Sequence, residues 1–359
     1  MTREVAGVSD ATLLESFERH RHELRLHCYR MMGSSLDADD LLQEAALRAW
    51  RAKSALAEAA SLRAWLYRIT TNVCLDELGR RRSRVLPFEA GTPASEPGSV
   101  TLNPQLEAFI EPCPRSWFEP APSDPSSSYE ARESVALAFV AALQQLTPRQ
   151  RATLLLRDVV GLSAEETAQA LELSLQAANS ALFRARSTVE VRLAGQPPAT
   201  PEPPDPATQG LLARYLAAWN QLDVAAFVAL LHEEVRTTMP PSPSWLAGRR
   251  DHVAFYTPMF AAQRPGAFVA IPTAANATAA FAFYRQLAAS QPHVLRAIHL
   301  VELKDDAIVS IDHFMLPELG PLFGLPATLG KAEVDVALEE RSCLELIGEH
   351  FSKRGQSHS

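Results

Sequence analysis

The chain has 359 residues, of which 47% are hydrophobic and 21% charged, and its formal net charge is −8. This length suits two or three domains, and the composition is that of a globular protein. No apolar run approaches the roughly 20 residues that cross a bilayer, and the N-terminus lacks the apolar core of a signal peptide. We therefore expect a cytoplasmic protein with no membrane partner. The four cysteines form no CxxC pair, so we expect reduced thiols, no bound metal and no cofactor.

Positive charge is concentrated in two short segments, although the chain as a whole is acidic. Residues 61–86 contain six arginines against two acidic residues, and residues 174–193 contain three arginines against one glutamate. The field of a surface charge acts within about one Debye length, roughly 8–10 Å. Two basic patches on an acidic chain can therefore still bind phosphate.

Proline divides the chain. Nine prolines lie between residues 87 and 125, and six lie between residues 197 and 206, which predicts extended linkers in both places. Within the first linker, Trp117 and Phe118 form an aromatic island that suits a docking peptide or is a chance feature of a linker. The resulting division is 10–86, 87–129 (linker), 130–194, 195–206 (linker), 207–330 and a tail at 331–359.

The first block is expected to be helical throughout. The run from Ala38 to Trp50 contains no Gly or Pro, and its small apolar residues share one face. Ser61 is a candidate N-cap for a second helix that begins at Leu62 and carries a broad apolar face.

The second block contains the sharpest motif, GLSAEETAQALELSLQAANSALFRAR. Ser163 and Glu166 form a predicted capping box for one helix, and Ser174 is the predicted N-cap of the next. The short break between them fits a helix-turn-helix, in which Glu172 takes a left-handed conformation at a cost of about 1 kcal/mol. The alternative is a plain helical hairpin with a solvated polar face.

The second helix of this motif would place its N-terminal residues at base edges in the major groove. Asn and Gln side chains pair with adenine, and Arg pairs with guanine or phosphate. We expect the apolar residues Leu175, Ala178 and Leu182 to pack inward. The candidate DNA-binding residues of this block are Gln176, Asn179, Ser180, Arg184 and Arg186.

The third block mixes helix and strand. Residues 210–231 have a helical pattern. Four segments rich in β-branched and aromatic residues are predicted strands, with a hairpin turn at Lys304–Asp306 between the last two. The predicted strands are 267–273, 279–285, 293–304 and 307–315.

The first two blocks resemble a known family. The segments ADDLLQEAALRAWR and SLRAWLYRITTNVCLDELGRRR resemble region 2 of extracytoplasmic-function (ECF) sigma factors of the sigma-70 superfamily. The segment LTPRQRATLLLRDVVGLSAEETAQALELSLQAANSALFRAR resembles region 4 of the same family, and the two occur in the family's order. The resemblance implies two all-α domains, a region 2 helical bundle and a region 4 helix-turn-helix.

The same resemblance implies the partners. Core RNA polymerase would be bound through its β′ clamp and β flap, and promoter DNA through the −10 and −35 elements. Asp40, Gln43 and Glu44 would dock on the β′ clamp helices. The chain would be a monomer outside the holoenzyme, and a protein that acted alone as a repressor would need no such docking helix. The linker over 87–128 would replace the region 3 domains and thread through the polymerase.

Region 2 would melt and hold the −10 element. Aromatic and arginine side chains together can hold unstacked bases, and a run of arginines suits phosphate contacts. Asn72 matches a base-contacting position of the family, whereas Trp65 suits the hydrophobic core at least as well. The candidate DNA-binding residues of this block are Arg63, Trp65, Arg68, Asn72, Arg80, Arg81 and Arg82.

The third block resembles the SnoaL-like fold, an α+β (cystatin-like) cone, through LLARYLAAWNQLDVAAFVALLHEEV, WLAGR and RAIHLVELKDDAIVSIDHF. Candidate cavity residues are Trp219, Trp245, His299 and Asp312. Strand alternation places Asp312 and His313 on opposite faces, so at most one of them faces the cavity. We expect a domain that regulates the sigma factor in cis and is not an enzyme. The alternatives are a small-ligand sensor, or a SnoaL-type enzyme that uses an acid–base pair such as His299 with Asp312 and is fused to a DNA-binding module.

Overall fold

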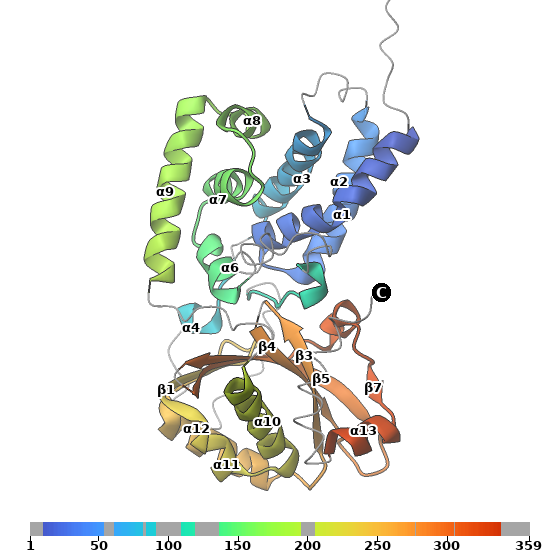
Figure 1. Ribbon diagram of the computed structural model, residues 1–359, viewed down its shortest axis with the longest axis vertical. Helices are drawn as coiled ribbons and strands as arrows, with labels where there is room; N and C mark the ends of the chain where they lie inside the picture. The colour runs from blue at the N-terminus through green and yellow to red at the C-terminus, as the bar shows by residue number, and fades with distance from the viewer. Residues whose placement is uncertain are drawn as a thin grey trace, which may run out of the picture. The chain divides into compact units, whose positions relative to one another are not determined.

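The computed structural model describes residues 10–53, 61–81, 84–90, 109–118, 136–194, 205–276, 278–304 and 306–338. The chain divides into two compact units (Figure 1). The helical unit combines residues 1–85 with residues 110–196, and the C-terminal unit combines residues 86–109 with residues 197–359.

The described part of the helical unit contains no long strand, as the sequence predicts for both of its blocks. The first block forms α1 (Asp10–Met32), α2 (Ser35–Arg51) and α3 (Leu62–Leu78). The second block forms α6 (Leu137–Gln144), α7 (Pro148–Leu154), the π-helical turn η5 (Leu155–Val159), α8 (Ala164–Ala170) and α9 (Leu175–Leu193).

Side-chain caps fix where these helices begin. The hydroxyl of Ser61 accepts from the backbone N–H of Ala64 at the start of α3. Ser163 and Glu166 form the predicted capping box of α8, and Ser174 caps α9. Such caps satisfy backbone donors that a helix otherwise leaves unpaired. Glu172 has φ +53°, so the predicted left-handed turn between α8 and α9 is confirmed.

The two helical blocks pack against each other within this unit. The fully buried guanidinium of Arg151 on α7 donates to the backbone carbonyl of Met31 at the end of α1 and to Gln144 Oε1 at 2.6 Å. The Gln144 amide donates to the carbonyl of Arg30 at 3.3 Å. Burial lowers the pKa of Arg151 to about 10, which still leaves it charged at neutral pH.

Part of the predicted linker is an ordered segment that packs within the helical unit. Residues 110–118, which we call the strap, run along the first block and contain the short 3₁₀ helix η4 (Arg115–Trp117). Ile110 donates its N–H to the carbonyl of Val85 at 3.1 Å, and Glu111 donates its N–H to the carbonyl of Gly33 at 2.9 Å. The prediction of an extended linker over 87–129 is therefore wrong for the strap, because its apolar side chains are buried.

Trp117 anchors the far end of the strap. Its side chain is fully buried, with the Arg25 guanidinium 4.2 Å from its ring centroid and the Tyr29 ring packed edge-on at 6.3 Å. Cation–π and edge-to-face contacts of this kind favour one fixed ring position. The aromatic island predicted to be a docking peptide thus docks within its own chain.

The C-terminal unit is built around one curved sheet. Its strands are β1 (Leu231–Thr238), β2 (Trp245–Ala247), β3 (Phe268–Ala275), β4 (Thr278–Arg285), β5 (His293–Lys304), β6 (Ala307–Phe314) and β7 (Thr328–Leu329). The order is β2-β1-β6-β5-β4-β3, with β7 added to β5. The pair β1–β6 is parallel and the others are antiparallel.

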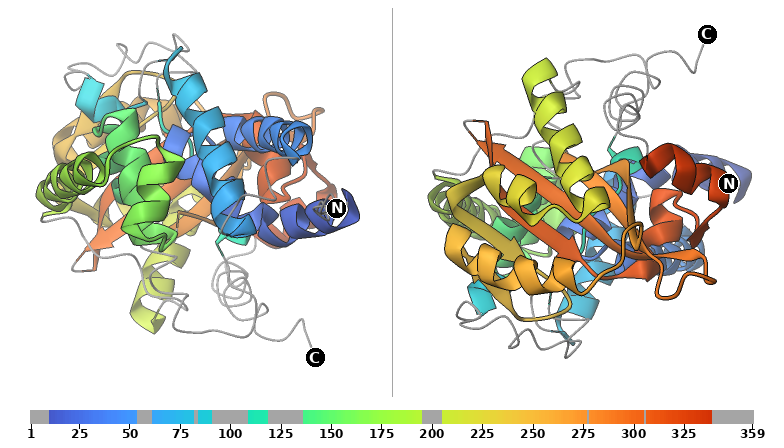
Figure 2. Two further views of the ribbon diagram at one scale, coloured as in Figure 1. Left: turned by 90° about the horizontal axis from the view of Figure 1, so that it is seen from above. Right: turned by 90° about the horizontal axis from the view of Figure 1, so that it is seen from below.

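The helices of this unit are α4 (Pro87–Ala90), α10 (Pro206–Gln221), α11 (Val224–Ala229), α12 (Gly248–Ala261), η6 (Pro317–Phe323) and α13 (Lys331–Leu338). Figure 2 shows α10, α11 and α12 lying across one face of the sheet. Their aromatic side chains and those of β4 form the main core, which includes Tyr215, Trp219 and Tyr256. A smaller core cluster includes Tyr284 of β4 and Ala337 of α13.

The four strands predicted from the sequence are confirmed as β3 to β6 to within about two residues. The elements β1, β2 and α12 were not predicted from the sequence, and the helix predicted over 210–231 is broken at Leu222, where φ is +57°. The tail contributes α13, and residues 339–359 lie outside the described part of the chain.

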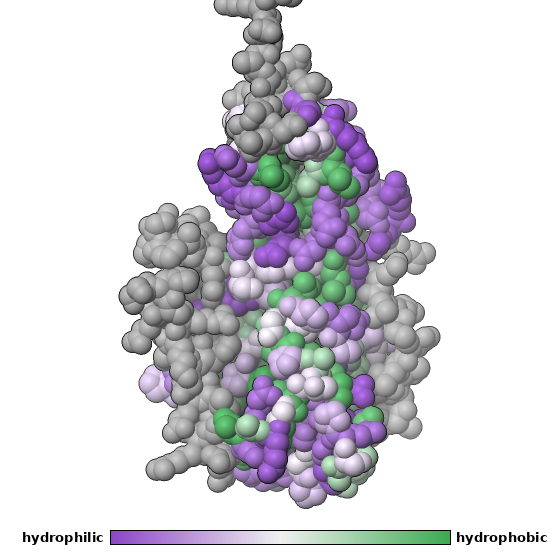
Figure 3. Space-filling model, turned by 90° about the vertical axis from the view of Figure 1, so that its right-hand side faces the viewer, coloured by the Kyte–Doolittle hydropathy of each residue, from purple (hydrophilic) through white to green (hydrophobic). Residues whose placement is uncertain are grey.

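The cysteines that the structure describes, Cys28, Cys74 and Cys113, are buried and form no disulfide with one another. No helix among the described residues is long and apolar enough to cross a membrane. On the face shown in Figure 3, hydrophobic side chains occur in patches between hydrophilic ones.

Candidate nucleic-acid interface

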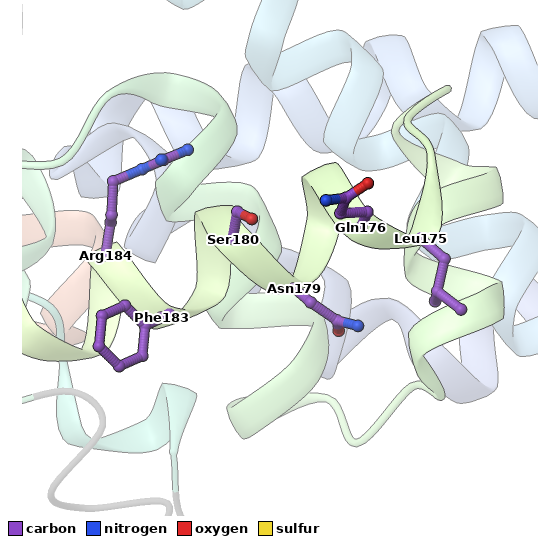
Figure 4. A pocket seen from close by; sticks show the side chains of 6 residues that line it. All are labelled: Leu175, Gln176, Asn179, Ser180, Phe183 and Arg184. Atoms are coloured by element: carbon purple, nitrogen blue, oxygen red, sulfur yellow. The ribbon is translucent and has the colours of Figure 1, made fainter.

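The exposed face of α9 carries the clearest candidate site. The open depression on this face is lined by Leu175, Gln176, Asn179, Ser180, Phe183 and Arg184. Figure 4 shows two rows at helical spacing, one of Gln176, Ser180 and Arg184 and the other of Leu175, Asn179 and Phe183. The structure therefore brings together four of the five residues that the sequence predicted for this block.

Two residues of this face differ from expectation. Leu175 was expected to pack inward with Ala178 and Leu182, but 44% of its surface is exposed, whereas the other two are buried. Its position in the first turn of α9 places it beyond the edge of the core. Phe183 was not predicted at all and is 76% exposed. Its spacing of four residues from Asn179 is the signal that could have placed it on this face.

Arg186 is the fifth predicted residue, and an acidic partner already binds it. Its guanidinium makes a bidentate pair with the Asp158 carboxylate, at 2.8 Å and 2.6 Å. The Asp158 hydrogen bonds raise the pKa of Arg186. Arg186 therefore lies on α9 but does not line the depression, which distinguishes it from Arg184.

The candidate DNA-binding residues on α3 differ in burial and in their partners. Arg63 is half-buried, pairs with the Glu23 carboxylate at 3.0 Å and donates to the carbonyl of Val160 at 3.1 Å. Arg68 and Asn72 are also partly buried. Trp65 is 4% exposed, so in this conformation it belongs to the hydrophobic core, which was the alternative reading of its role.

The arginines that follow α3 differ in how exposed they are and in how firmly carboxylates bind them, and therefore in how readily they could contact DNA. Arg80 is exposed and pairs only weakly with Glu77 at 3.4 Å. Arg81 is held by Glu77 and by Asp37, at 2.5 Å and 3.0 Å. Arg84 is buried between the carboxylates of Asp37 and Glu111, so the strap neutralises it. Arg82 lies outside the described residues.

The α2 helix exposes a stripe that runs beyond the predicted docking residues. Asp40 and Gln43 are exposed, while Glu44 is partly buried and holds Arg48 at 2.8 Å. Leu47 and Trp50 continue the stripe at spacings of three and four residues and are 52% and 46% exposed. These two residues were not among the predicted docking residues, although exposed apolar side chains next to polar ones are typical of an interface.

In the C-terminal unit, the predicted pair of His299 and Asp312 is not formed. His299 lies opposite His313 in the β5–β6 ladder, and their rings stack with centroids 3.6 Å apart. Tyr215 and Trp219 contact His299 from the helix side. Asp312 points to the other face, where its carboxylate accepts from the Thr238 hydroxyl at 2.5 Å. Successive side chains of a strand point to opposite faces, so Asp312 and His313 of β6 cannot both face the helices, as predicted.

Burial sets the protonation of these groups. Desolvation lowers the pKa of His313 to about 3 and lowers that of His299 well below its usual value. Desolvation also raises the pKa of Asp312, opposed by its bond to Thr238. Both imidazoles are therefore neutral at pH 7 and pack as core side chains. Trp245, another predicted cavity residue, lies on β2 and contacts Phe88 of α4.

Among the described residues, no group of three or more His, Cys, Asp or Glu side chains is placed to hold a metal ion. The helical unit consists of two helical blocks, and the second block ends in a helix-turn-helix that exposes a polar face.

Family models match the chain in three places. Sigma-70 region 2 matches residues 16–84, Sigma-70 region 4 matches residues 136–189, and a SnoaL-like domain matches residues 212–311. The ECF RNA polymerase sigma factor SigG of Mycobacterium tuberculosis is 41% identical over 312 residues, which cover 87% of this chain and 83% of SigG. The chain belongs to the ECF RNA polymerase sigma factors. As an ECF sigma factor it directs promoter-specific initiation of transcription and has core RNA polymerase and promoter DNA as partners.

A second ECF sigma factor supports the placement of the C-terminal domain. SigJ of Mycobacterium tuberculosis is 30% identical over 225 residues, which cover 63% of this chain and 64% of SigJ. The crystal structure of SigJ matches with a TM-score of 0.55 at 22% identity and covers 88% of this chain and 99% of that one, which shows a shared fold. The predicted fold class, two helical sigma domains followed by an α+β SnoaL-like domain, is confirmed.

Proposed function

We propose that this ECF sigma factor reads the −35 element with α9, opens and holds the −10 element with α3, and binds core RNA polymerase through α2. The observation that carries this proposal is the α8–α9 helix-turn-helix, which is capped at both helix starts and exposes a polar face on its second helix.

The side chains on α9 suit base readout. Gln176 and Asn179 lie in the first two turns, where a recognition helix meets base edges, and both side chains can pair with adenine. Arg184 is exposed two turns further along and suits guanine or phosphate. Phe183 offers an apolar surface to a thymine methyl group. Arg186 is a weaker candidate for a DNA contact, because the Asp158 carboxylate already neutralises its guanidinium.

For the −10 element, Arg63, Arg68, Asn72 and Arg80 are the residues that we retain as contacts. Arg63 must exchange its bonds to Glu23 and Val160 for bonds to DNA. Trp65 acts from the core and supports α3, because its indole is buried. Arg81 and Arg84 are bound by carboxylates and stabilise the end of α3.

The polymerase-binding surface would be the α2 stripe. Asp40 and Gln43 supply polar contacts to the β′ clamp helices, and Leu47 and Trp50 extend the contact with apolar area. A polar rim beside apolar anchors is typical of a specific protein interface. Region 4 would bind the β flap, and the free sigma factor would be a monomer.

We also infer that the SnoaL-like domain regulates the sigma factor in cis. This is supported by the grouping of residues 86–109, which directly follow region 2, with the C-terminal unit. The buried histidines of this domain pack as neutral core groups, which favours a regulatory role over acid–base catalysis.

Reconstitution tests the proposal. The full chain and core polymerase should transcribe from a promoter that is selected by binding of the reconstituted holoenzyme. Asn179→Ala should reduce transcription from that promoter, and Arg186→Ala, on the same helix outside the depression, should change it little. A chain that does not bind core polymerase at low salt would contradict the proposal.

A further inference from the structure

One carboxylate on α1, that of Glu23, binds two side chains of α3. Its Oε2 atom accepts from the Arg63 guanidinium, at 3.0 Å from Nη2 and 3.3 Å from Nε, and from the Tyr67 hydroxyl at 3.0 Å. Residues 63 and 67 are about one helical turn apart, so both side chains lie on the face of α3 that meets α1. Two donors of α3 therefore converge on one negatively charged oxygen.

The two donors also contact each other. The central carbon of the Arg63 guanidinium lies 5.1 Å from the centroid of the Tyr67 ring, within the range of a cation–π contact. The Tyr67 ring packs edge-on to His27, with centroids 5.3 Å apart, and only 3% of Tyr67 is exposed. The ring is therefore fixed in position, and its hydroxyl points to Glu23.

The protonation of these groups favours an anion at this place. Burial acts to raise the pKa of Glu23, but the hydrogen bonds and charge of Arg63 and the Tyr67 hydrogen bond lower it, so that the carboxylate is ionised at neutral pH. Burial and then the charge of Glu23 raise the pKa of Tyr67, so its hydroxyl keeps the proton and remains a donor. Arg63 and Tyr67 thus present a guanidinium and a hydroxyl to a single anion.

Arg63 has a second acceptor, which is easier to displace. Its Nη1 donates to the backbone carbonyl of Val160 at 3.1 Å. A carbonyl carries no net charge, so an approaching anion replaces it more readily than it replaces a carboxylate. The side chains of Arg63 and Glu23 are 38% and 44% exposed, so a ligand can reach the pair from solvent. Glu23 is therefore the main competitor of any external anion for Arg63.

We propose that Arg63 and Tyr67 form a binding site for a backbone phosphate of single-stranded DNA, and that the Glu23 carboxylate occupies this site until DNA displaces it. A phosphate oxygen and a carboxylate oxygen accept from a guanidinium in the same way. Contacts to phosphate position a protein on DNA without reading its sequence. The site rests on the proposed function, in which α3 holds the −10 element.

Glu23 acts through its two partners and is therefore a positioning residue. Displacing it costs free energy, which only DNA with enough further contacts to α3 can offset. Glu23 thus opposes binding of DNA that fits region 2 poorly.

Removal of the charge of Glu23 tests the site in the full chain. Glu23→Gln keeps an oxygen that can accept from Tyr67 but removes the charge that holds Arg63. Binding of a short fluorescein-labelled oligothymidylate strand, measured by fluorescence anisotropy at low salt, should strengthen by about threefold. The gain should disappear in the double variant Glu23→Gln/Arg63→Ala, whereas a general effect of net charge would persist there. Tyr67→Phe in the Glu23→Gln background should lose part of the gain, because the ring remains and the donor is removed.

The matched control is Glu18→Gln. Glu18 pairs with Arg21 on the same helix at 2.6 Å, with side chains 48% and 46% exposed, and Arg21 is not a candidate DNA contact. This variant makes the same change in net charge and should bind the strand like the parent. Thermal unfolding checks that each variant folds.

The proposal is overturned if Glu23→Gln binds the strand no more tightly than Glu18→Gln, including the case in which neither binds. A carboxylate that only clamped α1 to α3 would give this result, because its loss would weaken both folding and DNA binding. The measurement needs neither polymerase nor promoter. Loss of transcription with the expected strand binding would therefore count against the proposed function and not against the phosphate site.

Discussion

The imidazole rings of His299 and His313 stack face to face across β5 and β6, with centroids 3.6 Å apart and planes inclined by 3°. Phe283 stacks on the other side of His299, and Trp219 meets both histidines edge-on. Two adjacent imidazoles in an aromatic core are stable only while both are neutral, because a charge there would be buried and repelled by its neighbour. The stack therefore makes the C-terminal domain sensitive to acid.

Acid should destabilise this domain through His313. Its pKa is about 3 in the folded chain, against about 6.5 when unfolded, so the unfolded state binds the extra proton throughout this window. The free energy of unfolding should fall as pH drops through it, by about 2 kcal/mol between pH 7 and pH 5 from this residue. Urea titrations of the parent and His313→Asn should differ by this amount in their pH dependence.

The comparison with a variant is necessary because buried carboxyl groups act in the opposite direction. Burial raises the pKa of Asp312, and a raised carboxyl pKa favours the folded state as pH falls. His232→Asn, on β1 outside the aromatic core, is the control and should keep the parent's pH dependence. An unchanged pH dependence in His313→Asn would show that folding does not lower the pKa of His313.

Alanine variants of three residues of α9 should affect DNA binding in three different ways. Arg184→Ala should weaken binding of the holoenzyme to the −35 element and, if Arg184 contacts phosphate, lower the salt slope by about one. Asn179→Ala should cost roughly 1–3 kcal/mol at one base position and relax specificity there. Arg186→Ala should have little effect, because Asp158 neutralises that guanidinium. Equal, sequence-independent losses for all three variants would mean that the other face of α9 meets DNA.

Core polymerase binding should depend on the apolar end of the α2 stripe. Leu47→Asp places a charge in the middle of the proposed interface and should weaken binding to core polymerase at least tenfold, at a cost above about 1.4 kcal/mol. Leu14→Asp changes a similarly exposed leucine on α1 and should bind like the parent. Fluorescence anisotropy of the labelled full chain measures both. If both variants bind equally well, the interface ends before Leu47.

The strap should contribute strongly to the stability of the helical unit. Trp117→Ala removes a fully buried indole together with its contacts to Arg25 and Tyr29. The expected loss in the free energy of unfolding is about 3–5 kcal/mol. Denaturant unfolding followed by circular dichroism measures it. Trp50→Ala, which shortens an exposed tryptophan of the same unit, should cost less than about 1 kcal/mol, and equal losses would mean that the strap is not packed in solution.

Local sequence chemistry determined much of this protein. The capping serines Ser61, Ser163 and Ser174 each mark the start of a helix, because a short polar side chain next to a helical run satisfies free backbone donors. The β-branched residues of 293–304 predicted β5, and alternation placed Asp312 and His313 on opposite faces. The family resemblance, carried by two ordered motifs, identified the class of protein.

Only the tertiary structure decided which residues meet across long separations. Proline content predicted that residues 87–129 are extended, but the buried side chain of Trp117 and the bonds of Glu111 bring the strap back onto region 2. Arg63, Arg81 and Arg84 carry the same charge, yet Arg63 pairs with Glu23, whereas Arg81 and Arg84 share Asp37 and only Arg84 of the three is buried. Burial and ion pairing depend on residues far apart in the chain, and local patterns do not contain them.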